Sequence, residues 1–213
     1  MENKEIKVVV AIPSSDASGM NVLTAQCIGS AIIKAGGLVT DMIVRRSCDI
    51  VSNRTWLVNE AMRVGGTHIL FVDCDMLFPP DVIKTMLAHE KEIVGTEYVA
   101  RTFPLKAVFK PLTERSATEL YKAQFTGMGL MLIDLAIFKD PKFGIAEDGK
   151  KTAWFSFGRD SQGQLTWGED AWFSFMAADS GYPTWIDPTI QMFHLGEYGF
   201  CMPKDYEQVI KQA

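Results

Sequence analysis

The stretch Phe71-Val-Asp-Cys-Asp-Met-Leu-Phe-Pro-Pro80 places two carboxylates, Asp73 and Asp75, where an apolar strand gives way to a loop. Residues 68–72 carry no carboxylate, lysine or arginine and are β-branched or aromatic in part, which predicts a buried strand. The two prolines end this strand, and the second suits the first turn of a helix that starts near residue 81. Such a pair lies beside the crevice in which open α/β sheets bind ligands, and it suits a divalent cation shared with a diphosphate. A turn that merely contains two acidic residues is the alternative.

Length and composition indicate a globular enzyme-sized chain. Its 213 residues, 47% hydrophobic and 22% charged, are enough for one domain with a sizeable core. The net charge of −5 argues against broad nonspecific binding to nucleic acids, which needs many lysines and arginines. The four cysteines form no CxxC pair, so we expect reduced thiols. No signal peptide and no long apolar run is visible, which predicts a cytoplasmic protein without a membrane span.

Strand and helix patterns alternate in the first half of the chain. Strands are predicted over residues 6–12, 38–44, 67–72 and 92–98, and helices over 20–35, 50–64 and 81–89. This order predicts an α/β fold with a mostly parallel central sheet flanked by helices and right-handed crossovers. The second half predicts a smaller mixed region, with strands over 120–125, 129–133, 153–157, 183–187 and 189–193, a helix over 169–179, and a C-terminal helix over 203–213 that Pro203 opens. We expect one domain over 1–213, with a nucleotide-binding half (about 6–100) and an acceptor-side half (about 101–200).

Acidic residues also begin the predicted helix of the second half. The motif Trp167-Gly-Glu-Asp-Ala-Trp172 puts Glu169 and Asp170 in its first turn, where the helix dipole favours carboxylates. These residues either stabilise the helix start or place a carboxylate at the mouth of a site, where it takes a proton from an acceptor hydroxyl. Gly168 fits a close approach of the backbone to a ligand.

Two further residue types are expected at the same edge of the sheet. His194 follows a predicted apolar strand, and it is either structural or a nitrogen ligand that completes a site with Asp75. Such a donor set favours Mn²⁺ over Ca²⁺. Arg45 follows the second strand and Arg54 lies in the next helix, where a guanidinium either faces solvent or binds a phosphate or a planar base. Arg54 is the stronger candidate.

Taken in order, these motifs resemble the glycosyltransferase A (GT-A) fold, and most of all small family-2-like nucleotide-sugar glycosyltransferases. The resemblance covers about residues 6–198. The motifs that carry it are Pro13 after the first strand, Arg54, the Phe-Val-Asp-Cys-Asp-Met stretch, Thr126-Gly-Met-Gly-Leu-Met-Leu-Ile133, Gly168-Glu-Asp170 and His194-Leu-Gly196.

The resemblance implies a metal-dependent glycosyltransferase that moves a sugar from a nucleotide-diphosphate donor to an acceptor hydroxyl, with inversion. It implies that Asp73, near the ribose, and Asp75 bind the diphosphate and Mn²⁺ or Mg²⁺, assisted by His194. It implies Asp170 as the general base, with Glu169 beside it. The residues expected to contact the nucleotide sugar are Pro13, Ser14, Arg45, Arg54, Asp73, Gly127 and Gly129, the two glycines by letting the backbone approach the sugar or acceptor. The loop after the first strand lacks the family's usual motif, so the nucleotide base stays open.

Other functions fit the sequence less well. A nucleotidyltransferase needs a glycine-rich loop with a basic residue after the first strand, but residues 14–19 contain one glycine and no lysine or arginine. A dinucleotide-dependent oxidoreductase would need a G-x-G-x-x-G motif, which is missing. A noncatalytic nucleotide-sugar-binding module of the same fold remains the alternative.

The sequence does not identify the acceptor, which is a glycan, a small molecule or a modified nucleic acid. Several cations between residues 101 and 122 would favour an anionic acceptor if they formed one surface, and otherwise they are a solvated loop. They are Arg101, Lys106, Lys110, Arg115 and Lys122. No pattern indicates an oligomeric state.

Overall fold

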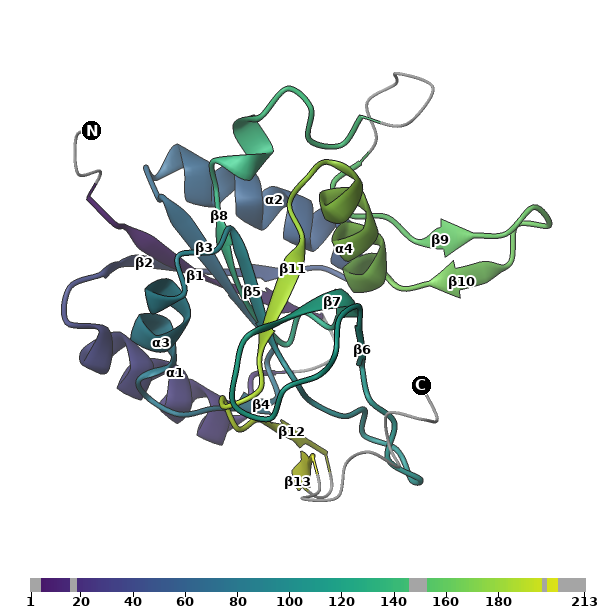
Figure 1. Ribbon diagram of the computed structural model, residues 1–213. Coiled ribbons are helices and arrows are strands. Elements are labelled where there is room, and N and C mark those ends of the chain that lie inside the picture. Colours follow the sequence, from purple (N-terminus) through teal and green to yellow (C-terminus); the bar gives the residue numbers. More distant parts are fainter. Residues whose placement is uncertain (1–4, 16–18, 146–152, 197–198, 203–213) are drawn as a thin grey trace.

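Eight strands form the central sheet of the computed structural model, which describes residues 5–15, 19–145, 153–196 and 199–202 (Figure 1). In chain order these strands are β1 (Val8–Ser14), β2 (Val39–Arg46), β3 (His68–Val72), β5 (Ile93–Thr96), β6 (Phe109–Pro111), β7 (Tyr121–Thr126), β8 (Leu130–Asp134) and β11 (Thr184–Asp187). Their order across the sheet is β2-β1-β3-β8-β5-β11-β7-β6. The predicted α/β class, with a large central sheet flanked by helices, is confirmed.

One strand from the second half of the chain lies at the centre of this sheet. β1 pairs in parallel with β2 and β3, and β5 with β11, but β8 lies antiparallel between β3 and β5. The four strands predicted in the first half therefore do not form one uninterrupted parallel sheet. The cause is the apolar sequence of β8, whose first four residues are at most 2% exposed and fit only a central position.

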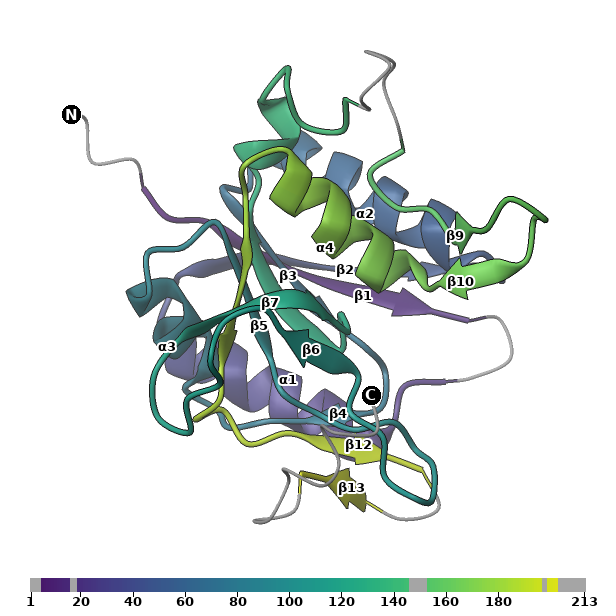
Figure 2. The same ribbon diagram turned by 45° about the vertical axis from the view of Figure 1, so that its right-hand side comes forward.

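Four α-helices of the described residues cover the two faces of the sheet. They are α1 (Val22–Ala35), α2 (Ile50–Arg63), α3 (Val82–Ala88) and α4 (Glu169–Asp179). α1 and α3 lie on one face and α2 and α4 on the other (Figures 1 and 2). Alternate residues of β1 pack into the two corresponding cores, Val8 and Val10 with α1 and α3, and Val9 and Ala11 with α2 and α4. Burial on both faces explains the continuous apolar run of this strand.

Local capping sets where the first two helices begin and end. The side chain of Asn21 accepts the Leu23 N–H (2.9 Å) at the start of α1, which ends at Gly36 with a φ of 66°. Asp49 caps α2 in the same way through the N–H groups of Val51 and Ser52. These caps place both helix starts beside the ends of parallel strands, which is where the predicted site lies.

Two small sheets complete the described fold. β4 (Met76–Leu77), β12 (Phe193–Leu195) and β13 (Gly199–Cys201) form one of them, and β9 (Gly158–Arg159) with β10 (Leu165–Trp167) forms a hairpin that projects from the body in Figure 1. A short 3-10 helix covers Ile137–Lys139. No helix in the described ranges has the length and apolar character that crossing a bilayer requires.

Two predicted strands are wrong. Residues 153–157 form no strand; their apolar pattern arises because Phe155 is fully buried and stacks on Phe173 of α4, with ring centroids 5.2 Å apart. Residues 189–192 belong to a turn and coil after β11, in which Asp187 accepts the N–H and hydroxyl of Thr189 (2.8 and 2.6 Å). The strand begins only at Phe193. The predicted C-terminal helix over 203–213 lies outside the described residues.

Candidate active site

The Asp73–Asp75 turn is held in place by one backbone hydrogen bond at each of its residues. The backbone of Asp73 bonds to the turn before β8 (3.0 Å), that of Cys74 to the N-cap residue of α1 (2.9 Å), and that of Asp75 to β12 (2.7 Å). The Cys74 thiol donates to the carbonyl of Pro13 (3.3 Å) and packs against the α1 side of the core. The two carboxylates therefore start from a fixed backbone.

Arg54 joins this turn to the start of α4. It is 3% exposed, its Nη2 lies 3.1 Å from Asp73 Oδ1, and its Nε lies 3.2 Å from Glu169 Oε1. The guanidinium also lies over the ring of Phe71, 5.2 Å from its centroid. Nη1 is buried and has no hydrogen-bond partner. The structure thus brings the two predicted acidic motifs to one edge of the sheet, with Arg54 beneath them.

Asp170 is a half-buried carboxylate with a raised pKa. Burial, with the neighbouring Glu169 charge, raises its pKa to about 6, although the Ala171 N–H (2.7 Å) and Arg54 act in the opposite direction. Burial thus outweighs the helix start, which favours the ionised form, in setting this pKa. The glycine at residue 168 makes room for this carboxylate, because a Cβ there would lie 2.8 Å from Asp170 Oδ1. At neutral pH the group is ionised and takes up a proton more readily than an ordinary aspartate.

His194 and Arg101 both face Asp75. His194 lies in the middle of β12, opposite Met76 of β4, rather than after a strand as predicted. Its Nδ1 is 3.0 Å from the carbonyl of Val99, and because a carbonyl only accepts, Nδ1 carries a proton. Nε2 then donates to Asp75 when the ring is protonated and offers a lone pair to a cation when the ring is neutral. Nε2 is 3.5 Å from Asp75 Oδ2, and Arg101 Nη1 is 2.9 Å from the same oxygen. Burial acts to raise the pKa of Asp75, but His194 and Arg101 outweigh it and lower the pKa.

The donor set fits a divalent cation only if a ligand completes it. In the part of the chain that the structure describes, no group of three or more His, Cys, Asp or Glu side chains converges on one point. Asp75 Oδ2 and His194 Nε2 are 3.5 Å apart, so both can reach one cation at ~2.1 Å. Asp73 is paired with Arg54 instead. Two donors suit a cation that takes its other ligands from water and a diphosphate.

The end of β1 lies at the same edge, whereas Arg45 contacts a helix. Register places Pro13 of β1 beside Arg45 of β2, and the carbonyl of Ser14 accepts a hydrogen bond from Asn53 Nδ2 (3.1 Å). The Arg45 guanidinium packs on the ring of Trp56 in α2, 4.7 Å from its centroid. Pro13 and Ser14 are therefore near the Asp73–Asp75 turn, and Arg45 makes its contact on α2.

The glycines of the turn between β7 and β8 surround a buried tyrosine. A Cβ on Gly127 would lie 2.1 Å from Tyr98 Oη, and one on Gly129 2.9 Å from the same ring. The Tyr98 hydroxyl accepts the Gly129 N–H (3.0 Å), and its ring meets His194 edge to face with centroids 5.6 Å apart. The absence of side chains at these glycines thus accommodates Tyr98, a role the sequence did not indicate. Burial raises the pKa of Tyr98 well above its usual range, so its phenol stays protonated.

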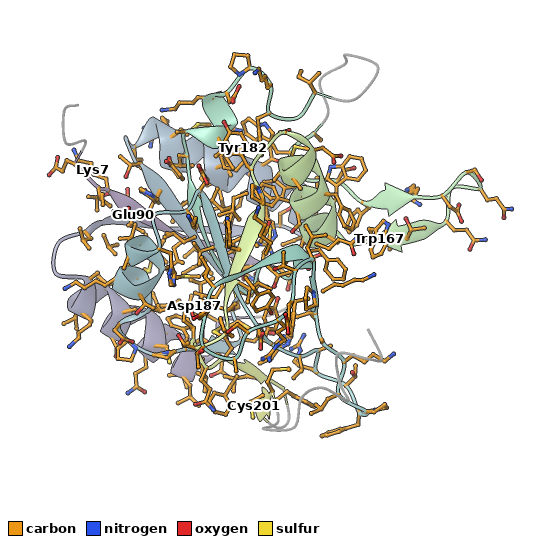
Figure 3. All side chains as sticks on the ribbon, in the orientation of Figure 1. Lys7, Glu90, Trp167, Tyr182, Asp187 and Cys201 are labelled. Atoms are coloured by element: carbon orange, nitrogen blue, oxygen red, sulfur yellow. The ribbon has the colours of Figure 1, made fainter. Side chains whose placement is uncertain are left out.

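An aromatic group lies next to Asp170 and was not assigned a role from the sequence. Trp167 is 42% exposed at the base of the β9–β10 hairpin, beside α4 (Figure 3). Its ring contacts Phe125 and Phe175, with centroids 5.7 and 5.1 Å away. An exposed aromatic surface beside a carboxylate suits the binding of an organic ligand.

The cations between residues 101 and 122 do not form one free basic surface. Arg101 is paired with Asp75, and Arg115 makes two short contacts with buried Glu97 (2.6 and 2.5 Å). Lys122 lies over the ring of Trp185, 5.1 Å from its centroid. This segment therefore forms no continuous positive surface that would favour an anionic acceptor.

Comparisons with known proteins show the fold but no family. No protein-family model and no curated protein matches this chain. The structure is similar to that of A197 from STIV, with a TM-score of 0.60 and 12% identity over 95% of this chain and 92% of that one. At this identity the likeness concerns the fold alone.

Two structures of TarS 1–349 from S. aureus are more distant, with TM-scores of 0.45 for the complex with UDP and 0.46 without. They are 13% and 14% identical, over 85% and 97% of this chain, which spans 57% and 64% of their length. Scores of this size support no conclusion about this chain.

Proposed function

We propose that this chain is a glycosyltransferase of the GT-A type, which moves a sugar from a nucleotide-diphosphate donor to an acceptor hydroxyl with inversion. The observation that carries the proposal is the Arg54 bridge between Asp73 and Glu169 (3.1 and 3.2 Å). Arg54 thereby holds the Asp73–Asp75 turn and the start of α4, which carries Asp170, at the same edge of the sheet. Glycosyl transfer needs both: stabilisation of a leaving diphosphate and a base for the incoming hydroxyl.

The bond changes assign a role to each group. The acceptor oxygen forms a bond to the anomeric carbon, its proton passes to the Asp170 carboxylate, and the bond to the diphosphate breaks with its electron pair on the leaving oxygen. Asp170, with a pKa of about 6, is ionised before the step and accepts the proton during it. Glu169 shares Arg54 and orients the acceptor, and Trp167 offers it an apolar surface.

The donor is proposed to lie over the ends of β1 and β3. Pro13 and Ser14 would contact the nucleoside, with Asp73 near the ribose, and Asp75 with His194 would hold Mn²⁺ or Mg²⁺. A divalent cation bound there supplies positive charge to the diphosphate as it leaves. Arg54, being buried and paired, positions Asp73 and Glu169 and does not touch the phosphates itself.

The test is release of a nucleoside diphosphate from a panel of nucleotide sugars, with and without Mn²⁺. We expect the wild-type protein to hydrolyse at least one donor slowly when Mn²⁺ is present, and Asp170→Asn to bind the same donor with much less release. Binding of donors without release, in the presence of an acceptor panel, would indicate a noncatalytic binding module. If calorimetry shows no binding of any nucleotide sugar or nucleoside diphosphate, the proposed function is wrong.

A further inference from the structure

Arg101 occupies the oxygen that a cation would need. Its Nη1 lies 2.9 Å from Asp75 Oδ2 and also donates to the carbonyl of Leu195 (3.3 Å). The same carboxylate oxygen is 3.5 Å from Nε2 of His194. The guanidinium therefore neutralises Asp75 at a place where a carboxylate oxygen and a ring nitrogen lie close enough to share one cation.

The backbone around Arg101 is fixed, but its side chain is not enclosed. The N–H of Ala100 donates to the carbonyl of Lys106 (2.8 Å), which closes the loop at its base. Phe103, at the tip, packs on Phe200 of β13 with ring centroids 5.1 Å apart. The Arg101 side chain itself is 49% exposed. It can leave Asp75 by rotating about its own bonds while the loop stays in place.

A divalent cation and this guanidinium compete for Asp75. Two positive groups next to one carboxylate oxygen repel each other strongly at such short range, so a cation that binds there displaces Arg101. The displaced guanidinium remains tethered at the edge of the site. A diphosphate bound to the same cation is its natural new partner, because a guanidinium binds phosphate oxygens through paired, charge-assisted hydrogen bonds.

We propose that Arg101 is an exchangeable counter-ion of this site. It pairs with Asp75 when no donor is bound, and it binds the donor diphosphate when a divalent cation takes the Asp75 oxygen. The identity of the ligand as a diphosphate rests on the proposed function, whereas the competition with a cation does not.

The exchange has effects of opposite sign, which a merely structural residue would not produce. Without Arg101 the Asp75 oxygen is open, so the cation alone binds more tightly, by about 2–5-fold as expected for removal of a partly exposed ion pair. A diphosphate at saturating cation then lacks one charged partner and binds about 10-fold more weakly or worse. Loss of fold would weaken both.

The experiment uses Arg101→Gln in the full chain, with Lys106→Gln as matched control. Lys106 carries the same charge in the same exposed loop, and among the described residues its side chain makes no ion pair with Asp75. Free Mn²⁺ is measured by electron paramagnetic resonance during titration of the protein, and UDP, GDP, CDP and ADP are then titrated by calorimetry at saturating Mn²⁺. Arg101→Lys, which keeps the charge, should lie between wild type and Arg101→Gln.

We expect Arg101→Gln to bind Mn²⁺ more tightly and the preferred diphosphate more weakly, and Lys106→Gln to match the wild type in both. Mn²⁺ affinity that is unchanged or lower in Arg101→Gln overturns the competition. Unchanged diphosphate affinity overturns the second half of the exchange. If no diphosphate binds even to the wild-type protein, both the proposed function and the binding of Arg101 to a diphosphate are overturned. The Mn²⁺ titration still shows whether Mn²⁺ and Arg101 compete for Asp75.

Discussion

The Asp73–Asp75 turn and the start of α4 hold the same type of side chain in opposite electrostatic surroundings. Asp75 faces Arg101 and His194, which outweigh its burial and lower its pKa. Asp170 makes no ion pair with any described residue, and burial beside Glu169 raises its pKa to about 6. Arg54 lies between the two motifs and is shared by one carboxylate of each.

The difference separates two chemical tasks. A carboxylate with a lowered pKa stays negatively charged over the ordinary pH range, and this constant charge suits it to bind a metal ion. A carboxylate whose pKa is raised towards neutrality can take a proton from a reacting group and return it. The contrast between Asp75 and Asp170 therefore supports a ligand role for the first and a base role for the second, and each prediction below probes one side of it.

The largest effect is expected at Asp170. Asp170→Asn keeps the size of the side chain but cannot accept the proton, so turnover should fall by about 10²–10⁴-fold, the range of a general base. Donor affinity, measured by calorimetry, should hardly change. Glu169→Gln should cost less. Near-normal turnover in Asp170→Asn, or a greater loss of turnover in Glu169→Gln than in Asp170→Asn, would show that Asp170 is not the base.

Arg54→Ala tests what connects the two motifs. Removing the shared cation leaves the half-buried carboxylates of Asp73 and Glu169 without their partner, so the free energy of unfolding should fall by about 1–3 kcal/mol. Arg54 also lowers the pKa of Asp170, so this pKa should rise in the variant. The decline of turnover on the acid side of the pH–rate profile should therefore move to higher pH. Chemical denaturation and a pH–rate profile check the two effects. A variant of unchanged stability with weaker donor binding would instead support the direct nucleotide contact predicted from the sequence.

Asp75→Ala tests the ligand side of the comparison. Mn²⁺-dependent binding of a nucleoside diphosphate should weaken by at least about 10–100-fold, since an anionic ligand and its charge-assisted contacts are lost. The fold should survive, because the turn is held by its backbone. His194→Ala should weaken binding less, since water replaces a neutral ligand more easily. Equal diphosphate affinity in wild type and Asp75→Ala would remove the metal assignment.

The sequence predicted those parts of the site that depend on local patterns. The apolar run of β3 followed by two aspartates places Asp73 and Asp75 at a strand end, and the helices predicted over 20–35 and 50–64 match α1 and α2 to within two residues. Such features depend on neighbours in the chain, so a single sequence reveals them.

The rest depends on contacts between distant segments. The insertion of β8 between β3 and β5, the Arg101–Asp75 pair and the packing of Tyr98 under Gly127 arise only when the second half folds onto the first. Nothing near Arg101 in the sequence distinguishes it from the other cations of its segment. The raised pKa of Asp170 was missed for the same reason, because burial is a property of the whole fold and here outweighs the local helix start.

The smallest effect expected is on stability, and its sign follows from the same pKa. In the folded protein Asp170 has a pKa of about 6 against its ordinary value of 3.8, so between pH 4 and 6 the folded state binds the proton more tightly than the unfolded state. The stability contributed by this group is therefore fully present below about pH 4 and is lost as the pH rises towards 6 and above. Asp170→Asn removes that loss, so at pH 7.5 it should be more stable than wild type by about 1–2 kcal/mol, since one pKa unit corresponds to about 1.4 kcal/mol. Thermal unfolding at pH 4 should show the two proteins nearly equal. If the variant is less stable than wild type at pH 7.5, the folded protein stabilises the ionised Asp170 carboxylate. The pKa of Asp170 would then not be raised, and Asp170 would not differ from Asp75 in this respect.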